Sequence, residues 1–211
     1  MPEVLKPDAD ISEEKILIRV AKIIAVGGII AYPTETFYGL GADATNEKAI
    51  QKIFAVKGRN FKNPISLIIG QPDDIYPLVK DIPQKAQKLM AAFWPGALTV
   101  IFSASDKVSS LLTAQTGKIG LRVSSHPLAS KIVRKIKRPL TATSANLTGS
   151  PECSLASEVI KQIGNRIEAI IDWGQTRGGK TSTIIDVTCN PPVIVREGAI
   201  SRETIDKCIM V

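Results

Sequence analysis

The sequence predicts a single α/β domain, in which helices flank a twisted sheet of mixed parallel and antiparallel strands. Its 211 residues are enough for one domain but not for two, because a domain typically has about 150 residues. A content of 44% hydrophobic and 22% charged residues is ordinary for a globular protein. Short apolar runs alternate with helical patterns along most of the chain, and β-branched runs follow one another closely near its C-terminus. We expect an N-terminal extension over residues 1–12 and the domain over residues 13–209.

Helices are expected where apolar residues recur every three or four positions. Asp10 or Ser12 can cap the first helix, whose apolar face runs from Ile16 to Ile24 and which stops at Gly27-Gly28. Further helical patterns cover residues 47–56, 83–93, 128–137 and 154–163, and a last one starts near residue 201.

Strands are expected where short apolar or β-branched runs lie between turn residues. The runs at 29–32 and 65–69 are continuously apolar, which is typical of strands buried on both faces. The other expected strands are 98–102, 119–123, 140–143, 169–172, 182–187 and 193–196.

Several classes of protein are excluded by composition. The longest run without polar or charged side chains, residues 23–32, is half of the roughly twenty residues that a membrane-spanning helix needs. The first ten residues lack the pattern of a secretory signal. Three scattered cysteines and a single histidine exclude a zinc site of standard spacing and argue against a disulfide framework. We therefore expect a soluble cytoplasmic protein with no membrane partner.

Positive charge is unevenly distributed along the chain. The net charge is +7, and no acidic residue lies between Asp106 and Glu152. This acid-free segment holds eight cations: Lys107, Lys118, Arg122, Lys131, Arg134, Lys135, Lys137 and Arg138. Such a field attracts a polyanion, either a nucleoside triphosphate or a nucleic acid. For residues 131–138 the simpler interpretation is that the cations complement the C-terminal dipole of a helix.

One phosphate-binding motif is rejected. Residues 174–181, GQTRGGKT, fit the P-loop pattern and follow a predicted strand. A P-loop also requires a helix that starts at the lysine, so that its N-terminal amides face the phosphates. The next residues, 182–187, are β-branched and predict a strand. We therefore interpret the segment as a flexible glycine loop.

Seven ordered motifs together resemble one known family. They are PTETFYGLG (33–41), KGR (57–59) with NP (63–64), WPGALT (94–99), GLRV (120–123) before HP (126–127), TSAN (143–146), STIID (182–186) and REG (196–198). In this order they resemble the YrdC-like family, whose members make threonylcarbamoyl-AMP for the t6A modification of tRNA. The resemblance covers about residues 13–209, and the chain looks like the short, single-domain form.

The resemblance implies a reaction and its partners. Members of the family join L-threonine, bicarbonate and ATP to give threonylcarbamoyl-AMP and pyrophosphate, and a downstream threonylcarbamoyl transferase machinery consumes the product. Such phosphoryl chemistry depends mostly on positioning and charge neutralisation. Mg²⁺ would arrive with ATP, because the chain offers no obvious metal cage of its own.

The resemblance also assigns residues to the ATP site. Lys57, Arg59, Ser144 and Asn146 match the active-site set of the family, and Arg196 matches a further ATP contact. Taken alone, Lys57 and Arg59 would be two solvated loop cations, and Ser144 and Asn146 an ordinary turn.

For threonine, the resemblance implies three residues. Arg122 is the candidate partner of the substrate carboxylate, because a guanidinium binds a carboxylate through two hydrogen bonds. Its alternative role is a structural ion pair. Thr34 and Ser182 match positions of the threonine pocket, and Tyr38 either closes that pocket or belongs to the core.

Three further side chains are expected to be structural or to lie outside the site, and one strand departs from the pattern of some relatives. Glu35 is expected to brace a turn rather than act as a base, and His126 to be a loop residue. Some relatives have histidine in the strand where this chain has Ser66 to Ile68, and serine where it has Glu152. We leave Glu152 out of the site, because a carboxylate would repel ATP.

Two other functions compete with the synthase. The acid-free segment is compatible with a module that binds double-stranded RNA or tRNA. The 174–181 loop is compatible with a small-molecule NTPase. A variant of the synthase hypothesis is a YrdC-like protein that binds nucleotides but has no synthase activity. Dependence of ATP turnover on threonine and bicarbonate separates the synthase from the others.

Overall fold

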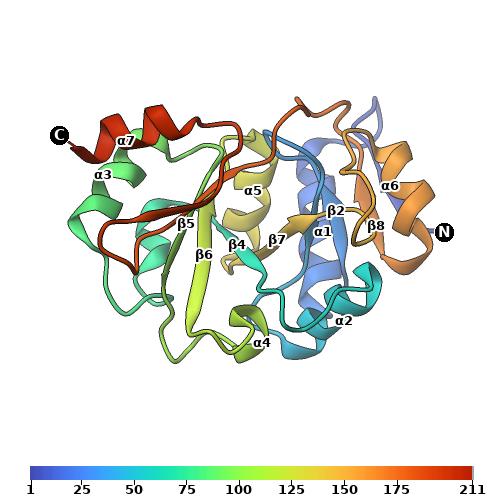
Figure 1. The fold of residues 1–211 in the computed structure, drawn as a ribbon. Coiled ribbons are helices and arrows are strands. Elements are labelled where there is room, and N and C mark those ends of the chain that lie inside the picture. The colour runs from blue at the N-terminus through green and yellow to red at the C-terminus, as the bar shows by residue number, and fades with distance from the viewer. Residues whose placement is uncertain (211) are drawn as a thin grey trace.

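The computed structural model describes residues 1–210 and contains a ten-stranded sheet (Figure 1). The strand order is β1-β8-β2-β3-β7-β4-β6-β5-β9-β10. The strands are β1 (Glu3–Leu5), β2 (Ile30–Tyr32), β3 (Gly39–Gly41), β4 (Ser66–Ile69), β5 (Leu98–Ser103), β6 (Lys118–Val123), β7 (Leu140–Ser144), β8 (Ala169–Ile171), β9 (Thr183–Asp186) and β10 (Val193–Arg196). The pairs β1–β8, β2–β8, β4–β6 and β5–β9 are parallel and the others antiparallel. This confirms the mixed sheet predicted from the sequence.

Helices cover both faces of this sheet. They are α1 (Glu13–Ala25), α2 (Glu47–Lys57), α3 (Gln84–Phe93), α4 (Ser110–Thr113), α5 (Pro127–Ile136), α6 (Ala156–Ile163) and α7 (Arg202–Met210), with short 3-10 turns at Pro72–Ile75 and Gly164–Arg166. Ser12 caps α1 through the Lys15 amide, as the sequence predicted. Helix α2 ends at Gly58, whose φ of 59° is a conformation that glycine adopts without strain.

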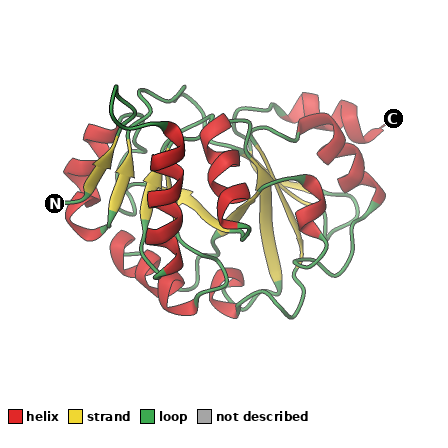
Figure 2. Ribbon diagram, turned by 180° about the vertical axis from the view of Figure 1, so that it is seen from behind, coloured by secondary structure: helices red, strands yellow, loops and turns green. Residues whose placement is uncertain are grey.

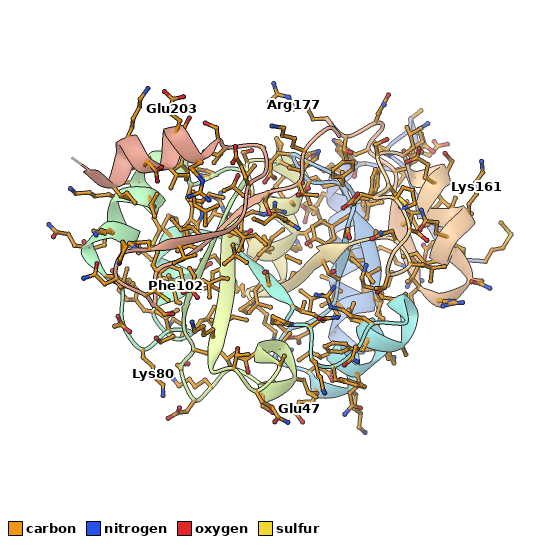
Figure 3. The ribbon with its side chains drawn as sticks, in the orientation of Figure 1. Glu47, Lys80, Phe102, Lys161, Arg177 and Glu203 are labelled. Atoms are coloured by element: carbon orange, nitrogen blue, oxygen red, sulfur yellow. The ribbon has the colours of Figure 1, made fainter. Side chains whose placement is uncertain are left out.

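Alternate residues of the central strands belong to two hydrophobic cores. Ile30 and Ile68 pack with α1 and α5, whereas Ala31 and Leu67 pack with α2, α3, α6 and α7. Figure 2 shows α1 and α5 side by side in front of the strands. In Figure 3 Phe102 lies among the strands, and the labelled charged side chains extend outward. The result is a three-layer arrangement of helices, sheet and helices.

Part of the expected N-terminal extension, residues 3–5, belongs to the sheet of the domain. Glu3–Leu5 forms the edge strand β1 and pairs in parallel with β8. Leu5 is buried in the core with α1 and α5. No strand was expected here, because a three-residue run with one charge carries no periodic signal.

Strand β3 was also absent from the predicted elements, because its sequence is Gly-Leu-Gly. Its glycines allow the ring of Tyr32 on β2 to lie directly against the strand. A Cβ at Gly41 would come within 2.7 Å of that ring. Close packing of an aromatic ring against backbone therefore replaces the apolar pattern that predicts most strands.

The glycine loop at residues 174–181 leads into strand β9, not into a helix. This confirms the rejection of the P-loop, since no helical amides follow Lys180. The loop is anchored at Gly178, whose amide donates to the Thr36 carbonyl at 2.7 Å. Figure 3 shows the side chain of Arg177 extending outward from the top of the molecule.

Over the described part of the chain, every helix is too short or too polar to cross a lipid bilayer.

Candidate functional site

A cavity of about 200 Å³ lies where the ends of several strands meet. Six residues predicted for the site line it: Thr34, Arg59, Arg122, Ser144, Ser182 and Arg196. They come from the loop after β2, the turn after α2, strands β6 and β7, and the segment around β9 and β10. The fold therefore brings together residues separated by up to 162 positions of sequence (34 to 196).

Two of the three guanidinium groups are held by backbone carbonyls. Arg59 donates to the carbonyl of Pro64 at 2.8 Å, and Arg196 donates to the carbonyl of Ser182 at 2.8 Å. Burial lowers the pKa of both groups, although arginine remains protonated in proteins. Neither forms an ion pair with another residue in 1–210. Their positive charge is thus available to an anion in the cavity.

Lys57 and Asn146 lie behind the cavity wall rather than on it. The Lys57 side chain is 3% exposed, and its ammonium donates to the Ser144 carbonyl at 2.5 Å and the Asn146 carbonyl at 2.8 Å. Its third contact is with Asn146 Oδ1 at 3.1 Å. All three ammonium hydrogens are therefore used within the protein. Burial, with a smaller contribution from Arg59, lowers the pKa of Lys57 to about 8.

Arg122 forms the ion pair that the sequence left as one of two alternatives, and its role as a carboxylate partner stays a prediction. Its Nη1 lies 3.3 Å from Glu35 Oε1 in a buried ion pair, and the side chain also lines the cavity. Glu35 accepts a hydrogen bond from the Ser124 hydroxyl, which agrees with the bracing role expected for it. Arg122 Nε is buried and has no hydrogen-bond partner among the described residues. The guanidinium edge that contains Nε and Nη2 is thus not used by Glu35.

Hydroxyl groups line the cavity beside the cations. Ser182 Oγ lies 3.1 Å from Thr99 Oγ1, and Thr34 Oγ1 donates to the Phe37 carbonyl at 2.7 Å. Tyr38 is fully buried, lines the cavity, and donates to the Gly174 carbonyl at 2.8 Å. It therefore serves both the core and the cavity wall.

The predicted site residues do not account for the whole wall of the cavity. Ser66 at the start of β4 and Thr99 in β5 both line the cavity, although the sequence reasoning gave them no role. A usable signal existed, because each is a polar residue in an otherwise apolar strand. Ile68, where some relatives have histidine, is fully buried in the core with α1 and α5.

Glu152 was expected to lie outside the site, but this residue lines the cavity. Its negative charge raises the pKa of both Arg196 and Lys57, against the larger lowering by burial. Neighbouring cations therefore offset the charge of this carboxylate.

No group of three or more metal-ligating His, Cys, Asp or Glu side chains occurs within residues 1–210. Glu152 is the one carboxylate among the residues that line the cavity.

Comparison with known proteins extends these observations. A family model named Sua5/YciO/YrdC, with the description "Telomere recombination", matches residues 22–198. The threonylcarbamoyl-AMP synthase of Pyrococcus abyssi is 41% identical over 199 residues, which cover 94% of this chain and 58% of that protein. The threonylcarbamoyl-AMP synthase of Vibrio campbellii is 39% identical over 183 residues, which cover 85% of this chain and 97% of that protein.

A solved structure agrees closely with the fold. The crystal structure of P. abyssi Sua5 complexed with L-threonine has a TM-score of 0.92 at 39% identity, covering 99% of this chain and 61% of that one. The chain thus spans less than two thirds of the length of the Pyrococcus proteins and nearly all of the Vibrio relative.

Proposed function

The chain belongs to the Sua5/YciO/YrdC family, and on that basis we propose that it is an L-threonylcarbamoyladenylate synthase. This makes it a nucleotidyltransferase that uses L-threonine, bicarbonate and ATP. The observation that carries the proposal is the convergence of Arg59, Arg122 and Arg196 on one hydroxyl-lined cavity. Three cations suit a ligand set that contains a triphosphate and a carboxylate.

The threonine end of the cavity is assigned to Arg122 and its neighbours. Arg122 lines the cavity, and its guanidinium suits a carboxylate, which a guanidinium can bind through two hydrogen bonds. The hydroxyls of Thr34 and Ser182 suit the threonine hydroxyl. The relative crystallised with L-threonine supports this choice of amino acid.

The ATP end is assigned to Arg59, Arg196 and Ser144. The two guanidinium groups neutralise phosphate charge, and the Ser144 hydroxyl donates to a phosphate or ribose oxygen. Lys57 and Asn146 act indirectly, because the Lys57 ammonium holds the backbone of residues 144–146 in place. Mg²⁺ enters with the triphosphate and supplies further charge neutralisation.

The reaction then needs two bond-forming steps. The neutral amine of threonine attacks bicarbonate, forming the N–C bond of a carbamate and releasing water. A carbamate oxygen attacks the α-phosphorus of ATP, and the bond to the bridging oxygen breaks, so that pyrophosphate leaves with the electron pair. The residues of the cavity align the two substrates and neutralise charge; they form no covalent intermediate.

The reaction is assigned to the cytoplasm, where a downstream threonylcarbamoyl transferase would consume the product. The test is pyrophosphate release by the purified protein, with the product identified by its mass. Release should require threonine and bicarbonate together. ATP turnover that is independent of threonine would contradict the proposal and favour a simple NTPase.

A further inference from the structure

The eight cations of the acid-free segment differ in whether they form ion pairs in the folded protein. Arg122 belongs to the candidate site, and four others form ion pairs of 2.9 Å or less: Lys118–Asp186, Lys131–Glu13, Lys135–Glu14 and Arg138–Asp43. The remaining three, Lys107, Arg134 and Lys137, form no ion pair with any residue in 1–210. The charge that stays uncompensated is therefore limited to these three side chains.

All three line a second cavity. It has a volume of about 480 Å³ and lies at the end of β4 and β7 opposite to Ser66 and Ser144. Arg138 also lines it. This cavity shares no lining residue with the candidate site. Its volume is within the range of about 300–1,000 Å³ that is usual for small-molecule sites.

The other lining residues divide into an apolar and a polar group. The apolar residues are Ile69, Pro77, Leu78, Val133 and Pro139, and the polar ones are Thr45, Gln71 and Asp74. Asp74 is the one acidic lining residue, and its Oδ2 accepts from the amides of Gly70 and Gln71 at 3.0 and 3.2 Å. Positive charge therefore exceeds negative charge around an apolar wall.

The helix dipole does not account for this cluster. Arg134 and Lys137 lie at the C-terminal end of α5, where cations are favoured. Lys107 comes from the loop after β5, and no helical end requires its charge there. Three exposed like charges repel one another, so a bound dianion would relieve a cost that the protein alone leaves in place.

We propose that this second cavity binds a nucleoside monophosphate. Lys107, Arg134 and Lys137 bind the phosphate, the apolar wall accepts the base, and Thr45 and Gln71 reach the ribose hydroxyls. The proposal is independent of the synthase activity, because none of these residues lies at the candidate site.

The test is a titration of ¹⁵N-labelled protein with AMP, GMP, CMP and UMP, followed by the amide signals of Ile69, Leu78 and Val133. At least one nucleotide should shift these signals saturably, and adenosine or inorganic phosphate should bind at least about tenfold more weakly. The amides of Thr143 and Ser144 report separately on the candidate site.

A matched pair of variants tests the charges. Lys107→Gln with Lys137→Gln should weaken binding at least about tenfold. Lys131→Gln with Lys135→Gln removes the same charge from paired lysines and should leave binding unchanged. The proposal is wrong if no nucleotide shifts the three signals, if both double variants behave alike, or if only duplex RNA shifts them.

Discussion

Replacing Lys57 by methionine tests whether this lysine acts by holding the loop that carries Ser144. Methionine preserves the length and much of the apolar stem but removes the ammonium. The carbonyls of Ser144 and Asn146 then lose donors at 2.5 and 2.8 Å. A hydrogen bond to a charged group contributes about 1.5–3 kcal/mol, so loss of this anchor should lower kcat/KM roughly ten- to hundredfold.

The pH dependence of Lys57 gives a sharper expectation. Its pKa is lowered from 10.5 to about 8 in the folded protein. Between these values the unfolded chain binds more protons, so the free energy of unfolding should rise with pH, by about 3 kcal/mol over the whole window. Activity should fall as pH rises, because the neutral amine of Lys57 has only two hydrogens for its three acceptors.

The measurement is denaturant unfolding and pyrophosphate release between pH 7 and 10 for wild type, Lys57→Met and Lys57→Arg. Wild type should gain stability relative to Lys57→Met as pH rises, while its activity falls. Lys57→Arg stays charged and should recover part of the activity without the decline near pH 8. Lys52→Met is the matched control, since Lys52 lies on the same helix and donates only to the Gly27 carbonyl at 2.9 Å.

Three results would refute the reasoning. If Lys57→Met keeps activity within about twofold of wild type, the anchor does not matter for the site. If the stability of wild type and Lys57→Met changes with pH in parallel, Lys57 does not titrate in this window. A loss of activity equal to that of Lys52→Met would show a general effect of substitutions in α2.

Three other substitutions test separate parts of the site. Arg59→Ala should lower kcat/KM at least about tenfold with little change in Tm, because the side chain lies at a cavity edge; near-normal specific activity would remove it from the site. Arg122→Lys should raise the threonine KM about ten- to hundredfold with the ATP KM unchanged, and a lower Tm with a normal threonine KM would leave only the ion pair with Glu35. Lys180→Ala should keep activity within about threefold, since a strand follows it; a loss of several orders of magnitude would restore the P-loop hypothesis.

The burial of Asn146 in the turn after β7 was not predicted from the sequence. Taken alone, Asn146 was interpreted as part of an ordinary turn, yet it is 5% exposed and donates to the Ser150 carbonyl at 2.5 Å. Its truncation should therefore lower Tm as well as activity. Local sequence indicates a turn at such residues, but it does not show that a distant lysine is buried beneath that turn.

The class of fold, most helices and strands, and the residues that carry the family motifs can be predicted from local sequence patterns. These features depend on periodicity and capping within a few neighbouring positions, which a linear pattern records. The rejection of the P-loop also rested on neighbours, because the β-branched residues after Lys180 are visible in the sequence.

Which of these residues lie together depends on the folded arrangement of the strands. Arg59, Arg122 and Arg196 converge because strands β4, β6, β5, β9 and β10 are neighbours in the sheet, an order that no local spacing encodes. The same order places Glu152 on the cavity wall and buries Lys57. It also brings Lys107 to the cavity beside the end of α5. Burial and charge compensation are properties of the whole fold, since they depend on residues that are distant in sequence and adjacent in space.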